Sequence, residues 1–493
     1  KVWCLRYGWA MKGEIMITIK RVLRDCLGLF CLLSLLAVSA DAATPKANVV
    51  IISVDDLNDW VGVLGGHPQA KTPGMDYLAS KGVLFSNAHC QSPVCNPSRA
   101  SLFTSQYPST SGIYFLNPDL TESPVSSKIT MLPQRFQKEG YDVSGVGKLY
   151  HGSQSKKYWP NWRTFGGAGY PWQKPKLSPF PGHPLWDWGV VKEADETMPD
   201  FKAAGWSEEA LKKEYDKPFL MGVGFSRPHV PQYATQKWFD LYPLKTLKLP
   251  KYKKDDVKDL SQFAVDLTRL EHVAPTHEWV VENNEWANLV QSYLASVSFV
   301  DAQVERVVKA IENSPHKDNT YILLFSDHGF HIGEKDRHAK RSLWEDSTRV
   351  PMMIAGPGIT PGVCEKPVQL LDIYPTLLAL AGLKKDAALE GHDLSPLLKN
   401  PKADWPHYAR TSFGPKNVAI ISEHYRFIQY HDGSEEFYDS RKDPEEWNNR
   451  IRNPEYKKVI DEHRAHVPQK RHAVLGSGST GHKSFEASKA KLK

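Results

Sequence analysis

The sequence predicts an α/β fold with a large mixed, mostly parallel β-sheet sandwiched by helices, and a smaller C-terminal α+β subdomain with an antiparallel sheet. Three observations predict it. Short apolar runs recur along the first 400 residues, helical patterns lie between them, and the pattern changes after residue 397. Strands that alternate with helices are typical of a sheet covered on both faces. We therefore expect domains at 44–397 and 398–493.

The predicted strands of the large sheet are nearly continuous apolar runs, which suit strands buried on both faces. They lie at residues 47–54, 141–146, 219–225, 321–325 and 350–355, and we expect them to be parallel. The clearest helix is 289–311, where Val290, Leu294, Val297 and Val304 share one stripe. Residues 158–188 are rich in Pro, Gly and Trp and predict a long ordered loop, which either shapes a pocket or packs as an aromatic cluster.

After residue 397 the sequence pattern changes to that of an antiparallel sheet. Residues 418–421 and 425–430 predict antiparallel strands that precede a final helix. The polar and basic tail after residue 467 predicts a frayed end.

The first 43 residues predict an export signal. Lys20, Arg21 and Arg24 precede an apolar run at 26–40, and the small residues Ala40 and Ala42 flank a cleavage site. The run is too short to span a membrane comfortably, so no membrane span is expected in the mature form. These residues hold six Lys/Arg and three Asp/Glu, so the net charge of +6 falls to about +3, which does not suggest nucleic-acid binding.

Three cysteines remain beyond that segment: Cys90, Cys95 and Cys364. An odd and small number excludes a disulfide framework. Every Asn lacks the N-x-S/T glycosylation pattern, since Asn96 is followed by proline. We therefore expect a periplasmic or secreted bacterial protein, with Cys90 as a buried or free thiol.

Polar residues gather where four of the predicted strands end. In open α/β sheets this is the edge at which ligands bind. The first strand runs into Asp55 and Asp56, and the fourth into Asp327 and His328. Adjacent carboxylates at the end of a buried strand repel each other unless a cation lies between them, which predicts a metal site. Oxygen ligands favour calcium or magnesium, whereas His328 keeps zinc as a rival.

The other strand ends carry basic groups. They are Lys148 and His151 after the second strand and His229 after the third, and Arg99 and Lys340 would join them. Brought together, such groups form a cationic pocket for a tetrahedral oxyanion. Taken singly, each is more often a surface charge or a hydrogen-bonded polar residue.

The segment "CNPSR", Cys95 to Arg99, resembles the C-x-P-S-R signature of the type I sulfatases of the alkaline-phosphatase superfamily. The blocks "VDD", "GVGKLYHG", "RPHVP" and "SDHGFHIGEKDRHAK" follow that family's order, and the pattern is most similar to its iduronate-2-sulfatase branch. The resemblance implies an alkaline-phosphatase-like fold and a sulfuric ester hydrolase. It also implies that a formylglycine-generating enzyme oxidises Cys95 to formylglycine, whose hydrated aldehyde is the nucleophile.

Carried over by position, the resemblance gives each residue a role. Asp55, Asp56, Asp327, His328 and residue 95 surround Ca²⁺. Arg99 steadies the hydrated aldehyde, and His151 is the candidate base for release of sulfate. Lys148, Lys340 and His229 neutralise the sulfuryl oxygens and the leaving alkoxide, with His229 or Lys340 as the general acid.

The implied substrate is a sulfated mono-, oligo- or polysaccharide, with a 2-O-sulfated uronic acid as the candidate. Two other functions fit the same residues. One is a phosphodiesterase or phosphonate hydrolase of the same superfamily. The other is a non-catalytic protein that binds sulfated glycan, if Cys95 remains a thiol.

Overall fold

The central sheet of the computed structural model has eight strands in the order β13-β2-β12-β9-β1-β7-β4-β5. The structure describes residues 46–152, 155–269 and 273–490. The predicted export signal at 1–43 lies outside them. The strands are β1 Asn48–Asp55, β2 Gly82–Phe85, β4 Asp142–Gly147, β5 Asn161–Arg163, β7 Phe219–Pro228, β9 Thr320–Ser326, β12 Met352–Ala355 and β13 Gly362–Cys364.

Strand β1 lies at the centre of this sheet and pairs in parallel with both β7 and β9. β4 continues the parallel pairing on β7. The prediction that residues 350–355 form a parallel strand is wrong, because β12 runs antiparallel to both β9 and β2. The chain passes from β9 to β12 by the short α12 (Glu345–Thr348) without a crossover helix, so β12 returns in the opposite direction. The mixed, mostly parallel sheet is as predicted.

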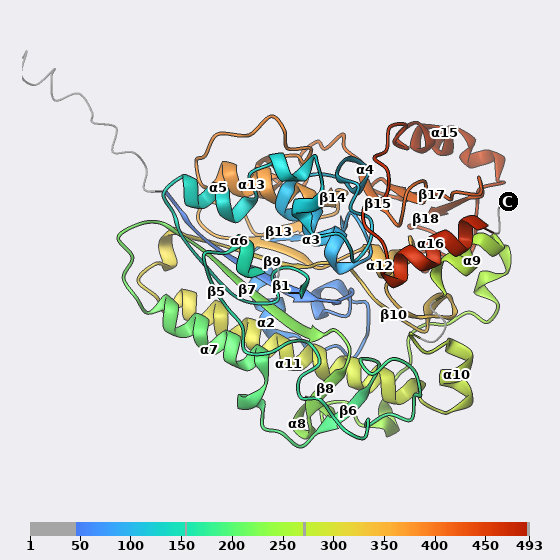
Figure 1. The fold of residues 1–493 in the computed structure, drawn as a ribbon, viewed down its shortest axis with the longest axis horizontal. Helices are drawn as coiled ribbons and strands as arrows, with labels where there is room; N and C mark the ends of the chain where they lie inside the picture. The colour runs from blue at the N-terminus through green and yellow to red at the C-terminus, as the bar shows by residue number, and fades with distance from the viewer. Residues whose placement is uncertain (1–45, 153–154, 270–272, 491–493) are drawn as a thin grey trace, which may run out of the picture. The chain divides into compact units, whose positions relative to one another are not determined.

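Helices cover both faces of the sheet (Figure 1). On one face lie α2 (Pro73–Lys81), α7 (Pro199–Leu211) and α11 (Trp286–Glu312), and on the other α3 (Cys95–Thr104), α5 (Leu132–Lys138) and α13 (Ile373–Leu380). Successive side chains of β1 point to opposite faces of the sheet and join two hydrophobic cores. Val50 and Ile52 belong to the core with α11, and Val49 and Ile51 to the core with α13. The full burial of this strand explains its unbroken apolar run.

A second, fully antiparallel sheet contains β15 (Ala409–Ser412), β16 (Val418–Ile421), β17 (Tyr425–Gln429) and β18 (Glu435–Asp439). Helix α15 (Lys457–Ala465) packs on one face through Ile460, and Trp344 lies in the core of the opposite face. The antiparallel strands confirm the sequence prediction. The described residues from Ala47 onward form one compact unit, and the boundary at residue 397 stays a prediction.

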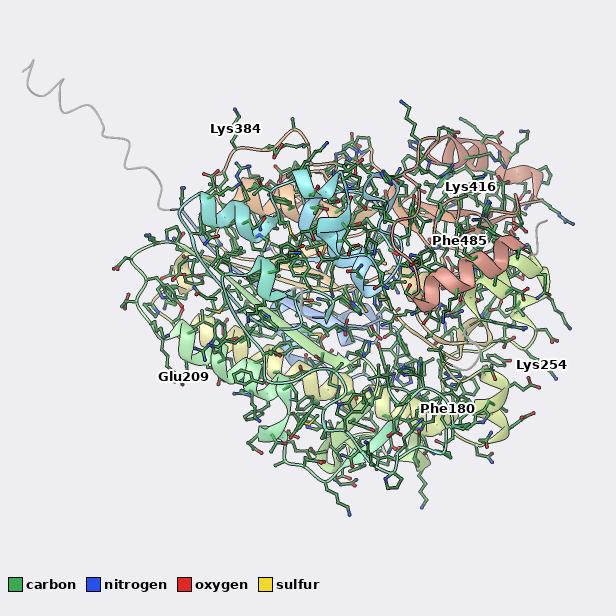
Figure 2. All side chains as sticks on the ribbon, in the orientation of Figure 1. Phe180, Glu209, Lys254, Lys384, Lys416 and Phe485 are labelled. Atoms are coloured by element: carbon green, nitrogen blue, oxygen red, sulfur yellow. The ribbon has the colours of Figure 1, made fainter. Side chains whose placement is uncertain are left out.

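The chain's last described segment is helix α16 (Thr480–Ala490). Phe485, labelled in Figure 2, is buried on this helix and packs 5.9 Å from Phe115 between ring centroids. The prediction of a frayed tail is therefore wrong, because Phe485 and His482 are both buried and both pack against Phe115. Among the residues that the structure describes, no helix combines the length and apolarity needed to cross a membrane.

Candidate active site

The ends of β1 and β9 bring the acidic residues together. Asp55 ends β1 and Asp56 follows it, while Asp327 and His328 follow β9, and these side chains are at most 1% exposed. The backbone N–H of Asp56 donates to Asp327 Oδ1 at 3.2 Å, which ties the two strand ends together. Asp56 adopts a left-handed conformation with φ of 61°, which is uncommon for a residue other than glycine. Such backbone outliers concentrate at functional sites.

Cys95 begins the buried helix α3 and faces this acidic cluster. Its Sγ lies 3.2 Å from His328 Nε2 and 3.2 Å from Lys340 Nζ. Burial raises the pKa of the Cys95 thiol, although Lys340 and Lys148 act in the opposite direction. An unmodified thiol here stays protonated at neutral pH and is a poor nucleophile.

Arg99 lies one turn further along α3 and is completely buried. It donates to Asp327 Oδ2 at 2.9 Å and to Asp55 Oδ1 at 3.1 Å. Its remaining bonds go to Ser53 Oγ and to the carbonyls of Lys148 and Leu149. Burial alone would lower the Arg99 pKa, but the two carboxylates raise it above its usual value. Arg99 therefore holds the ends of β1, β4 and β9 in one arrangement.

Two lysines reach the same cluster. Lys148 pairs with Asp55 Oδ2, and Lys340 Nζ lies 2.6 Å from Asp56 Oδ1. Burial disfavours the charged form of both lysines, yet the neighbouring carboxylates raise both pKa values. Burial alone would also raise the Asp55 pKa, but Lys148, His229 and Arg99 bring it well below its usual range. Both lysines and Asp55 are thus charged at neutral pH.

Two histidines complete the cluster. His229 Nδ1 donates to the Val230 carbonyl at 2.5 Å, which leaves Nε2 without a proton when the ring is neutral. Burial and the nearby Lys148 and Lys340 lower its pKa well below the usual value. The same causes lower the pKa of His151 to about 4. Both rings are therefore neutral at pH 7, and His151 can accept a proton.

The donor set fits a hard divalent cation. Two sets of side chains, Asp55 with Asp56, Cys95 and His229, and Asp55 with Cys95, Asp327 and His328, each place ligand atoms within 4.8 Å of one another. Asp56 Oδ2 is buried with no hydrogen-bond partner, and burial raises the Asp56 pKa to about 7. A bound cation would satisfy that oxygen and favour the ionised carboxylate.

A cavity of about 750 Å³ opens over the cluster. Its wall includes Asp56, Cys95, Lys148, His151, His229 and Lys340. From the Trp-rich loop, Trp162, Trp172 and Trp186 also line it, whereas Trp159 is fully buried and Trp188 packs beside Phe180. The loop therefore both shapes a pocket and forms an aromatic cluster.

The structure thus brings all ten predicted site residues together, while their roles remain predictions. Cys90 is a buried free thiol, as expected. Sequence reasoning missed Arg341, which lines the same cavity and directly follows Lys340. Its only signal in the sequence was that position, which does not tell a pocket residue from a surface residue.

Comparison with known proteins places this geometry in a family. The family model described as Sulfatase matches residues 47–383, which is more than half of the chain. The chain belongs to the sulfatase family. It is a type I sulfatase of the alkaline-phosphatase superfamily and a sulfuric ester hydrolase. A second model, N-sulphoglucosamine sulphohydrolase, C-terminal, matches residues 333–473.

Curated relatives cover most of this sulfatase. A sulfatase of Formosa agariphila is 40% identical, with 86% of this chain and 87% of the relative covered. The iduronate 2-sulfatase of Mus musculus is 29% identical over 72% of each chain. The Δ4,5-hexuronate-2-O-sulfatase of Bacteroides thetaiotaomicron is 26% identical, with 87% and 89% covered.

Solved structures support the fold. A 2-O GAG sulfatase superposes with a TM-score of 0.64 at 24% identity, covering 85% of this chain and 90% of the other. A phosphonate monoester hydrolase of Agrobacterium radiobacter superposes with a TM-score of 0.70 at 20% identity, with 91% and 96% covered. These likenesses confirm the predicted fold class.

Proposed function

We propose that this sulfatase depends on formylglycine at position 95 and releases inorganic sulfate from a sulfated carbohydrate. The observation that carries the proposal is the position of Cys95. Its Sγ lies 3.2 Å from both Lys340 Nζ and His328 Nε2, beside three buried carboxylates. A thiol that stays protonated has little use as a nucleophile there, which favours its role as a precursor.

Formylglycine at this position would supply a hydroxyl of its hydrated aldehyde as the nucleophile towards sulfur. The chain's own residues orient that side chain. His328 and Lys340 contact position 95 directly, and the first turn of α3 fixes its backbone. Ser98 donates to the Asp327 carbonyl at 2.5 Å, so helix α3 is held against the end of β9.

Ca²⁺ is the proposed metal, held by Asp55, Asp56, Asp327, His328 and residue 95. It would supply positive charge to a sulfate oxygen and favour ionisation of the nucleophile. Three of the four unmodified ligands are carboxylates, which suit calcium better than zinc. Arg99 keeps two of these carboxylates in place through its ion pairs.

The cationic groups of the cavity would stabilise charge on the reacting ester. Lys148 and Lys340 remain protonated beside position 95 and can counter the sulfuryl oxygens. Lys340 or His229 would donate the proton that leaves with the alcohol: Lys340 already carries a proton, whereas His229 would first have to gain one at Nε2 when the substrate binds. His151, neutral above pH 4, is the proposed base for the step that releases sulfate.

The proposed substrate class is a sulfated mono-, oligo- or polysaccharide, with a 2-O-sulfated uronic acid as the candidate. Trp162 and Trp172 offer aromatic faces at the cavity, and Trp172 is 57% exposed. The names of the mouse and Bacteroides relatives, which act on iduronate and hexuronate 2-sulfates, support the choice of sugar. Maturation would need a formylglycine-generating enzyme, and we propose a periplasmic or secreted location.

Side-by-side turnover of an aryl sulfate and the matching aryl phosphate tests this function. We expect the sulfate ester to react faster in protein that carries the aldehyde. Faster turnover of the phosphate would instead favour a phosphodiesterase or phosphonate hydrolase. Binding of sulfated glycan by a protein with an unmodified thiol and no turnover would favour the non-catalytic alternative.

A further inference from the structure

Among the described residues that line the active-site cavity, Arg341 is a cation that forms no ion pair with a carboxylate. Close to position 95, the charges of three carboxylates and three cations cancel formally; they belong to Asp55, Asp56 and Asp327, and to Arg99, Lys148 and Lys340. Arg341 lines the same cavity and adds a further positive charge. Asp56 is the only carboxylate on the described part of the cavity wall, and it already pairs with Lys340.

Within the described part of the chain, no hydrogen bond or ion pair holds the guanidinium group of Arg341. The residue is 7% exposed, and its Nη1 is buried without a hydrogen bond. Across residues 46–152, 155–269 and 273–490, no carboxylate forms an ion pair with it. Burial consequently lowers the Arg341 pKa. Burying an unpaired charge is unfavourable, so such a group in a cavity is expected to meet an anion there.

The backbone of Arg341 is held in a strained conformation. Its φ of 78° lies in the left-handed region, and its N–H donates to the Pro93 carbonyl at 3.2 Å. Pro93 lies two residues before Cys95, so the same bond links Arg341 to the segment that carries position 95. Strain of this kind persists where surrounding structure enforces it, often at ligand-binding sites.

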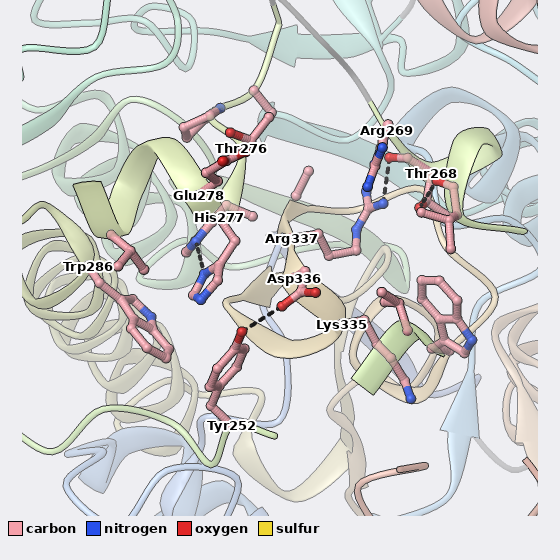
Figure 3. A pocket seen from close by; sticks show the side chains of 18 of the residues that line it. Tyr252, Thr268, Arg269, Thr276, His277, Glu278, Trp286, Lys335, Asp336 and Arg337 are labelled. Carbon is pink, nitrogen blue, oxygen red and sulfur yellow. Dashed lines mark hydrogen bonds between the residues drawn. The ribbon is translucent and has the colours of Figure 1, made fainter. Parts of the chain in front are cut away.

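Arg337, four residues before Arg341, provides a comparison with an arginine whose role is structural. It is also buried without a carboxylate partner, but it donates to the backbone carbonyls of Thr268 and Lys340. Figure 3 shows its guanidinium group directed towards Thr268 in a second cavity, which shares Ala339 with the active-site cavity. The Arg337 guanidinium group therefore joins segments of the chain, whereas the Arg341 guanidinium group donates to none of the described side chains or carbonyls.

We propose that Arg341 binds the carboxylate of a uronic acid whose sulfate group reacts at position 95. The inference rests on the proposed function and names a feature of its substrate. The sulfate group itself is served by Lys148 and Lys340, which already contact the cluster. A guanidinium group matches a carboxylate by two parallel hydrogen bonds, a geometry that lysine does not offer.

The test compares two sulfated disaccharides that differ at one group. One contains a 2-O-sulfated uronic acid, and the other is the same molecule with the carboxyl group reduced to an alcohol. We expect wild-type kcat/KM to favour the uronate form, and Arg341→Gln to lower that preference at least tenfold, mainly through KM. Arg341→Lys should recover only part of it. The exposed Arg452, changed to Gln, serves as the matched control and should keep the wild-type ratio.

Aryl sulfate turnover separates failure of this inference from failure of the function. If Arg341→Gln lowers kcat/KM equally for both disaccharides and for the aryl sulfate, the inference is overturned. Arg341 would then bind the sulfate group or stabilise the fold. Wild-type activity on the aryl sulfate without activity on the uronate would also overturn it and leave the sulfatase proposal intact. Inactivity of the aldehyde-bearing protein on every sulfate ester would refute the proposed function itself.

Discussion

Removal of the Arg99 side chain should destabilise the fold as well as the site. In Arg99→Ala, two buried carboxylates lose their ion pairs at 2.9 and 3.1 Å. Asp55 keeps Lys148, but the nearly inaccessible Asp327 keeps no cation at that distance among the described residues, apart from His328 if it is protonated. Breaking one buried pair in this way costs about 3–5 kcal/mol. Total stability is typically about 5–15 kcal/mol, so the loss is large.

The assay is urea-induced unfolding followed by tryptophan fluorescence, with chelator in every sample so that metal does not compensate the charge. Arg99→Lys keeps the charge but loses the planar group that reaches three strand ends, and we expect an intermediate loss. The exposed Arg163, changed to Ala, should alter stability by less than about 0.5 kcal/mol. A loss below about 1 kcal/mol in Arg99→Ala would show that Arg99 does not hold the carboxylates in place.

Four further predictions concern activity. Cys95→Ala should reduce sulfate release to background while the far-UV spectrum stays that of the folded chain; retained turnover would place the nucleophile elsewhere. Asp55→Asn should weaken calcium binding at least about tenfold by calorimetry and lower the rate with it; unchanged affinity would remove Asp55 from the ligands. His151→Asn should lower kcat by about 10²–10⁴, and the wild-type kcat at saturating calcium should fall as pH drops towards 4, where His151 gains its proton; a kcat that stays constant down to pH 3 would contradict this role. His229→Ala and Lys340→Ala identify the general acid. The variant that removes it should lose more activity on a sugar sulfate than on p-nitrophenyl sulfate, because the sugar alkoxide needs a proton to leave and p-nitrophenolate does not.

Much of the fold could be predicted from the sequence, because β1 is buried on both faces. Val49 to Val54 form a nearly continuous apolar run, as expected for a central strand of a covered sheet, and the long apolar stripe of α11 predicts the helix beside it. The direction of β12 could not be predicted, because an apolar run has the same pattern in a parallel and in an antiparallel strand. The docking of α16 depends on Phe485 meeting Phe115 across the fold, which no local pattern reveals.

The candidate site was predictable for a similar reason. Its acidic and basic residues follow strand ends, and the ends of parallel strands meet at one edge. The role of Arg341 was not predictable from the sequence, because it depends on the absence of an ion-pair partner among the described residues. Only the arrangement of neighbouring carboxylates shows that Lys340 is paired and Arg341 is not.

Mass spectrometry of the tryptic peptide spanning residues 82–99 tests the central claim most directly, in protein produced with a formylglycine-generating enzyme. We predict a peptide in which Cys95 has lost hydrogen sulfide and gained one oxygen, with Cys90 still an intact thiol and the aldehyde reactive towards a hydrazide. An unmodified Cys95 in protein that fully hydrolyses sulfate esters would contradict the account.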